Sequence, residues 1–112
     1  MPNYLLATDP RGYKVECSDQ RFEYLLYKHE ESADLLNEAI IKEAIEEPKD
    51  NEIFRSGKKS KENFHIYYKD IEERKAEVRV IVKYDPDSFG ELITFHLCSR
   101  RPPNEETIWK DQ

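Results

Sequence analysis

The chain has 112 residues, a formal net charge of −6 and 38 % charged residues. This length is typical of one domain, which can bury roughly two thirds of its unfolded surface without a metal or a disulfide. The negative charge argues against nonspecific nucleic-acid binding, which needs clustered Lys and Arg. No apolar run approaches the roughly 20 residues of a membrane span, and no basic region with a following apolar run begins the chain. We therefore expect a single domain, residues 1–112, in the cytosol, with no membrane segment.

Residues 1–17 are predicted to form an N-terminal β-hairpin. Residues 4–8 are apolar, residues 9–12 carry the Pro and Gly of a turn, and residues 13–17 alternate apolar with polar side chains.

Two helices are expected within residues 18–47. Ser18 and Asp19 offer capping side chains for the first helix, Ser32 offers one for the second, and Pro48 ends the second. Apolar side chains recur at helical spacing in both helices: Phe22, Leu25 and Leu26 in the first, and Leu36, Ala39, Ile40 and Ala44 in the second.

Residues 52–98 are predicted to form an antiparallel sheet. Residues 52–55, 64–68, 76–84 and 91–97 read as strands, and the three longer ones alternate with period two. In the last of them, Leu92 is expected on the face opposite Phe95. The tail, residues 101–112, is expected to lie over the surface and to pack through Ile108 and Trp109. The expected fold class is therefore α+β, with two N-terminal helices packed on an antiparallel β-sheet.

The two cysteines, Cys17 and Cys98, are far apart in sequence and fall within predicted strands. They lack the spacing of a metal site, so we expect buried free thiols rather than a disulfide.

The three histidines are candidates for acid–base chemistry, because imidazole titrates near neutrality. His29 falls where the first helix ends, a position at which the helix dipole also favours a cation. On the sheet, alternation would place six polar groups on one face: His65, Tyr67, Arg79, Lys83, Thr94 and His96. The simpler interpretation of that face is the solvated side of an antiparallel sheet. The residues alone leave both interpretations open.

Such a polar set could support RNA cleavage without a metal. His and Lys suit proton transfer at the ribose 2′-hydroxyl and the leaving oxygen, while Arg, Thr and Tyr can stabilise and position the phosphate. The chain has no HExxH, no regular ligand cluster and no Gly-rich phosphate loop, so no metal and no cofactor are expected. A basic run suits RNA binding, although such a run also occurs in solvated loops: Arg55, Lys58, Lys59 and Lys61.

Eight short segments follow one another in a recognisable order: residues 9–15, 21–25, 29–31, 39–40, 47–48, 67–69, 80–83 and 93–95. Their order resembles that of small domains in the Barnase/EndoU/colicin/RelE-like nuclease superfamily. Tyr24 and Glu30 depart from that pattern, which has a histidine and a proline there. The resemblance implies two N-terminal helices against an antiparallel sheet, and metal-independent RNA cleavage by a phage-borne or toxin-type protein.

Three hypotheses about function follow. The first is a metal-independent RNA endonuclease, a toxin or defence effector with an antitoxin or immunity protein as partner. Its catalytic residues would be His29 as acid or base, Lys83 and Arg79 on the phosphate, and Thr94 and Tyr67 as hydroxyl positioners, on a positively charged concave face. The second is a catalytically inactive relative that acts as a protein-interaction module, with a convex, solvated sheet face. The third is a small-molecule-binding or structural domain whose tyrosines line a pocket.

Overall fold

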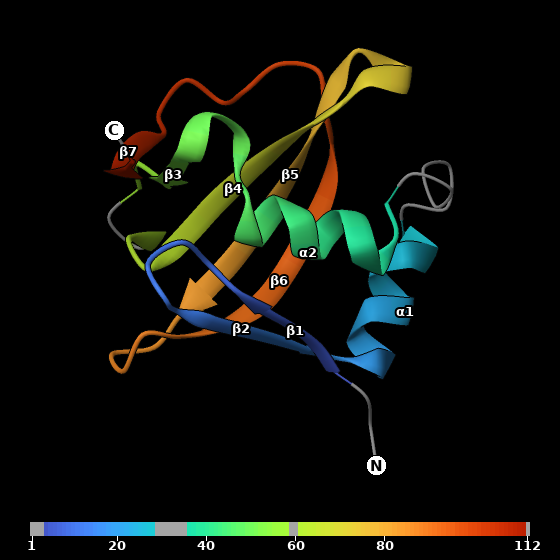
Figure 1. Ribbon diagram of the computed structural model, residues 1–112, viewed down its shortest axis with the longest axis horizontal. Helices are drawn as coiled ribbons and strands as arrows, with labels where there is room; N and C mark the ends of the chain where they lie inside the picture. Colours follow the sequence, from blue (N-terminus) through green and yellow to red (C-terminus); the bar gives the residue numbers. More distant parts are fainter. Residues whose placement is uncertain (1–3, 29–35, 59–60, 112) are drawn as a thin grey trace.

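The computed structural model describes residues 4–28, 36–58 and 61–111. It is an α+β fold, in which two helices accompany a seven-stranded mixed sheet that is strongly curled into a half-barrel (Figure 1). The strand order is β1-β2-β6-β5-β4-β3-β7. In chain order the elements are β1 (Tyr4–Thr8), β2 (Lys14–Ser18), α1 (Asp19–Lys28), α2 (Glu38–Glu46), β3 (Glu52–Arg55), β4 (Phe64–Ile71), β5 (Ala76–Tyr84), β6 (Phe89–Cys98) and β7 (Glu106–Lys110).

The predicted hairpin is confirmed, since β1 and β2 pair antiparallel. Its turn is organised by Asp9, whose Oδ1 accepts the backbone N–H groups of Arg11 (2.9 Å) and Tyr13 (3.0 Å). Gly12 follows with φ +90°, a left-handed conformation that glycine adopts without steric cost.

Both helices begin at a capping side chain. Ser18 Oγ accepts the Arg21 N–H at 3.3 Å, so α1 starts where the sequence predicts. The second helix is capped by Asn37, whose Oδ1 accepts the Ile40 N–H at 3.0 Å. It therefore begins at Glu38 and not near Ser32, which lies outside the described residues.

The sheet is mixed, which corrects the expectation of a purely antiparallel one. Strands β4, β5 and β6 pair antiparallel in succession, as predicted. Strand β2, however, pairs parallel with β6, from Lys14 opposite Phe89 to Glu16 opposite Glu91. The tail does not merely cover the surface, because β7 pairs antiparallel with β3 and Trp109 lies opposite Ile53.

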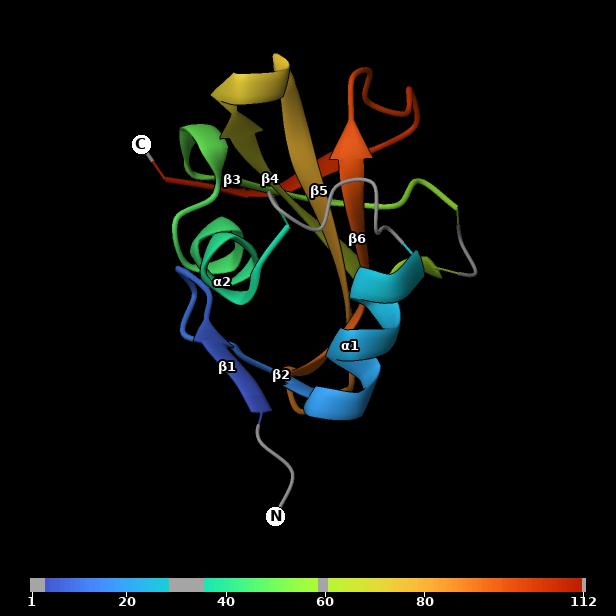
Figure 2. The same ribbon diagram turned by 90° about the vertical axis from the view of Figure 1, so that its right-hand side faces the viewer.

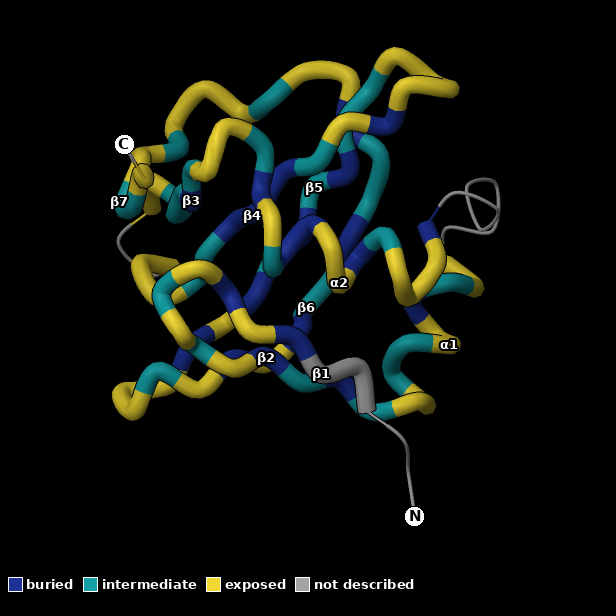
Figure 3. Tube along the Cα trace, in the orientation of Figure 1, coloured by how far each residue is buried: buried dark blue, intermediate teal, exposed yellow. Residues whose placement is uncertain are grey.

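The curled sheet has an inner face and an outer face. It bends around α2, which fills the inner, concave side (Figure 2). The buried side chains of α2 join the inner-face side chains in the main core, which is the dark band through the middle of Figure 3. Its fully buried members include Ile41, Ala44, Ile45, Tyr67, Val78, Val80, Val82, Leu92 and Phe95. Burial of this apolar surface is the main term that favours the fold.

The outer face carries a second, smaller core. Ile66, Tyr68 and Cys98 are its buried members, with Phe54 and Ile81 packed against them. Residues 99–105, which we call the crossing segment, lead from β6 to β7 (Figure 1). Arg101 of this segment lies over the Phe54 and Tyr68 rings of the smaller core.

A β-bulge in β6 reverses part of the expected alternation. Ile81 lies opposite Thr94, but the next residue, Val82, lies opposite Leu92, so Ile93 is the extra residue. Leu92 therefore shares the inner face with Phe95, and the expectation that they lie on opposite faces is wrong.

Cys17 and Cys98 are both free and buried, as predicted. Neither helix within the described ranges is long and apolar enough to cross a lipid bilayer.

Candidate functional site

The structure separates the six polar sheet residues onto two faces. Tyr67 lies opposite the inner-face residue Val80, so Tyr67 points inward, and His65 on the same strand does too. The prediction of one shared face is therefore wrong. His29 and Lys59 lie outside the described residues. The other four polar residues lie on the outer face: Arg79, Lys83, Thr94 and His96.

His65 and Tyr67 belong to a polar cluster built on Asp9, which is 3 % exposed. Asp9 Oδ2 accepts hydrogen bonds from Arg11 Nε (2.9 Å) and from the Tyr67 hydroxyl (2.9 Å). The hydroxyl oxygens of Tyr67 and Tyr84 lie 2.5 Å apart, and Arg11 Nη2 lies 3.0 Å from His65 Nδ1. This Asp9 cluster fastens the β1–β2 turn to β4 and β5.

Burial fixes the protonation of the Asp9 cluster. Burial, and then the charge of Arg11, lower the pKa of His65 to about 4. Burial also raises the pKa values of the Tyr67 and Tyr84 hydroxyls. At neutral pH the imidazole is therefore neutral and both hydroxyls keep their protons. The Tyr67 hydroxyl is engaged in a structural hydrogen bond to Asp9, and Tyr67 does not face the outer side of the sheet.

Arg79 is engaged in an ion pair on the outer face. Its Nε lies 3.0 Å from Glu105 Oε2, and the Tyr68 hydroxyl donates to the same carboxylate. The side chains of Arg79 and Glu105 are 14 % and 7 % exposed. Arg101 stacks over the Tyr68 ring at 4.0 Å and pairs with Glu77. These contacts fasten the crossing segment to the sheet and neutralise the charge of Arg79.

A pocket of about 390 Å³ opens on the outer face beside the crossing segment. We call it the lysine pocket. Phe64, Ile66, Ile81 and Ile93 give it an apolar lining, and Pro102 and Pro103 of the crossing segment close one side. It also brings together four residues predicted from the sequence: Lys58, Lys61, Arg79 and Thr94. Arg55 does not line it, because its guanidinium pairs with Glu106 at 2.8 Å.

Phe64 is the aromatic side chain of the lysine pocket. Its ring centre lies 5.5 Å from Lys61 Nζ and 5.9 Å from Lys83 Nζ. None of Lys58, Lys61 and Lys83 forms an ion pair within the part of the chain that the structure describes. Two positive charges that form no ion pair within the described ranges therefore lie close to the ring, a cation–π geometry.

The shape of the lysine pocket depends on Gly57. A side-chain methyl at this position would overlap the backbone carbonyl of Asn104. Only glycine lets the loop that carries Lys58 and Lys61 come this close to the crossing segment.

Part of the exposed negative charge lies away from the lysine pocket. Helix α2 exposes the carboxylates of Glu38 and Glu43, Glu47 follows at its C-terminal end, and the helix packs against the inner face. The net charge of −6 thus coexists with an outer pocket whose unpaired charges are positive.

Sequence reasoning missed Phe64 and Glu105 as parts of this site. The short spacing from Lys61 to Phe64 was visible, but the approach of Lys83 to the ring depends on the register of β4 and β5, in which Phe64 and Lys83 are opposite. Glu105 meets Arg79 only because the crossing segment folds back over the sheet.

Comparison with known proteins gave no match to a family model, to a curated protein or to a solved structure. The resemblance to the nuclease superfamily therefore stays a prediction. Within the described ranges, no three His, Cys, Asp or Glu side chains are grouped so that they could hold a metal ion.

Proposed function

We propose that this protein binds single-stranded RNA on the outer face of its sheet. The observation that carries the proposal is the Phe64 ring with the ammonium groups of Lys61 and Lys83 at 5.5 and 5.9 Å from its centre, in an otherwise largely apolar pocket.

Each part of the lysine pocket suits one part of a nucleotide. An aromatic ring can stack on any of the four bases, and such stacking contributes about 1–3 kcal/mol of binding free energy per base. Unpaired lysines attract the phosphates on either side of that base. The hydroxyls of Ser56 and Thr94 line the same pocket and can bond a ribose or phosphate oxygen.

RNA cleavage, which the resemblance implies, would use residues of the same outer face: Arg79, Lys83 and Thr94. The Arg79 guanidinium is occupied by Glu105, and Tyr67 is enclosed on the inner face. Binding is therefore the function that the geometry supports best, and cleavage is a further outcome of the same experiment.

A convex outer face was the expectation of the protein-interaction hypothesis, and the sheet does bend away from that face (Figure 2). An acidic peptide could use the same lysines. RNA is favoured because the aromatic ring lies close to two cations, an arrangement that suits a base and its neighbouring phosphates together.

Fluorescence anisotropy with a labelled single-stranded decaribonucleotide tests the proposal. We expect Lys61→Gln and Lys83→Gln each to weaken binding and to reduce the slope of log K against log salt by about 0.7, the value for one phosphate contact on a single strand. Lys42→Gln is the matched control, because Lys42 is exposed on α2, away from the outer face.

Equal losses in the three variants, or no binding by the wild type, would contradict the proposal. Running the samples in EDTA and resolving the RNA on a gel tests cleavage at the same time. Intact RNA in a binding-competent sample would exclude the endonuclease hypothesis, and an acidic peptide that binds where RNA does not would support the interaction module.

A further inference from the structure

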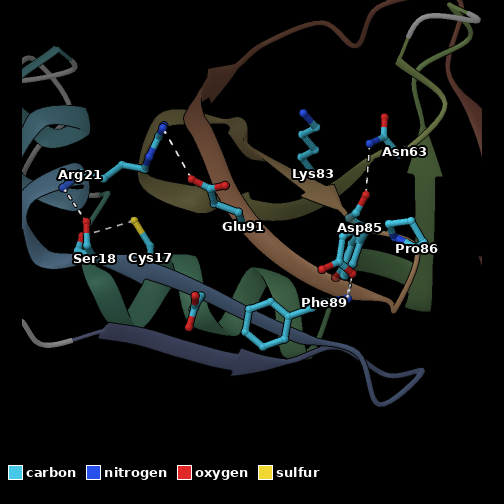
Figure 4. Close-up of a pocket in the computed structure, with 11 residues that line it drawn as sticks. Cys17, Ser18, Arg21, Asn63, Lys83, Asp85, Pro86, Phe89 and Glu91 are labelled. Carbon is cyan, nitrogen blue, oxygen red and sulfur yellow. Dashed lines mark hydrogen bonds and ion pairs between the residues drawn. The ribbon is translucent and has the colours of Figure 1, made fainter.

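A second pocket, of about 540 Å³, opens next to the lysine pocket, beside the turn between β5 and β6 (Figure 4). We call it the turn pocket. We propose that it holds the next nucleotide of the same RNA strand, with the shared phosphate at Lys83. This inference rests on the proposed function and extends it from a single base to a site that reads consecutive nucleotides.

Lys83 joins the two pockets. It lines the turn pocket, and its ammonium also lies 5.9 Å from the Phe64 ring of the lysine pocket. Figure 4 shows its side chain extending into the open space between Glu91 and Asn63. Asn63 and Phe64 are consecutive residues that line the turn pocket and the lysine pocket respectively. A phosphate at Lys83 would therefore have one base on each side.

Phe89 gives the turn pocket its own stacking surface. It is 41 % exposed, which is high for a large apolar side chain, and Figure 4 shows its ring beside the open space. The parallel register places Phe89 opposite the exposed Lys14. Each of the two aromatic residues thus has a lysine opposite it on the neighbouring strand: Lys83 opposite Phe64, and Lys14 opposite Phe89.

The carboxylates of the turn pocket set the direction of the nucleotide. Arg21 Nη2 lies 3.7 Å from Glu91 Oε1, and Asp85 Oδ1 accepts two backbone N–H groups of its own turn at 2.9 Å. Glu16 lies beside Glu91 in the register, on the β2 side. Lys83 lies opposite Glu91 in the register of β5 and β6, so the phosphate would bind the Lys83 ammonium on the side away from Glu91. A carboxylate of the pocket can accept a hydrogen bond from a ribose hydroxyl.

The thiol of Cys17 also lines the turn pocket. Burial raises the pKa of the Cys17 thiol to about 11, so Cys17 stays protonated at neutral pH.

A length series of labelled oligouridylates of one, two, four and six nucleotides tests the inference on the full chain. For the wild type, we expect affinity to rise when a second nucleotide is added. We expect Phe89→Ala to lose roughly ten-fold in affinity for the longer oligomers and nothing for the mononucleotide, as for the loss of one stacked base. Tyr27→Ala is the matched control, since Tyr27 is an exposed aromatic (75 %) on α1 that lines neither pocket.

Each outcome decides one proposal. An unchanged affinity in Phe89→Ala, or a loss as large for the mononucleotide as for the hexamer, would overturn the second subsite while leaving RNA binding intact. A wild type that binds no oligomer of any length would instead overturn the proposed function. Circular dichroism of Phe89→Ala confirms that this exposed substitution leaves the fold unchanged.

Discussion

Replacing Asp9 with alanine is expected to lower the free energy of unfolding by about 3–5 kcal/mol, the range for removing one partner of a buried ion pair. The Asp9 carboxylate is the acceptor for Arg11, Tyr67 and two backbone N–H groups of the turn. Without it, the Arg11 guanidinium, whose side chain is 12 % exposed, loses its counter-charge. Urea denaturation followed by circular dichroism measures the loss.

Asp85→Ala is the matched control for this prediction. Asp85 also accepts two backbone N–H groups in a turn, but it is exposed and, among the residues that the structure describes, forms no side-chain hydrogen bond or ion pair with an arginine or a tyrosine. We expect it to cost about 1 kcal/mol. Equal losses in the two variants would mean that the Asp9 cluster contributes no more than an ordinary turn.

Stability is expected to fall by about 3 kcal/mol as the pH drops from about 6.5 to about 4, through the titration of His65. Burial beside Arg11 lowers the pKa of His65 to about 4 in the folded state, whereas an unfolded histidine titrates near 6.5. Between these values the unfolded chain binds a proton that the folded chain does not, so lowering the pH favours unfolding. Below about pH 4 both states are protonated and His65 adds no further loss.

The variant His65→Gln isolates this contribution, because glutamine does not titrate. Thermal unfolding of both proteins at several pH values between 4 and 7 gives the comparison. We expect the wild type to lose more stability than the variant over this range. Identical pH dependence in the two proteins would show that His65 does not titrate in the way its contact with Arg11 requires.

Local patterns in the sequence were sufficient to predict much of the fold. The turn at residues 9–12, the cap at Ser18 and the alternation of β5 each depend on neighbouring residues, and each prediction is confirmed. The parallel pairing of β2 with β6 joins residues about 75 positions apart, such as Lys14 and Phe89, and no local signal marks it. The cap at Asn37 was missed because Ser32 and Asn37 have equally suitable side chains.

The candidate site was harder to predict, because it depends on the register between strands. In β4, both sets of alternating residues contain aromatic side chains, so hydrophobicity did not show which set faces the core. Tyr67 lies opposite Val80, so its side chain points inward, away from the face of Arg79. If the register were shifted by one residue, Tyr67 would point outward, toward the face of Arg79. The sequence did single out Lys58, Lys61, Arg79 and Thr94, which meet in the lysine pocket.

The central claim is that RNA occupies the outer face of the sheet, and an NMR titration tests it most directly. Amide spectra of ¹⁵N-labelled protein would be recorded while a single-stranded hexaribonucleotide is added. The account predicts shift changes at Phe64, Lys83, Thr94 and Phe89, and none along α2. Changes confined to the helices, or no change at RNA concentrations that saturate a micromolar site, would contradict it.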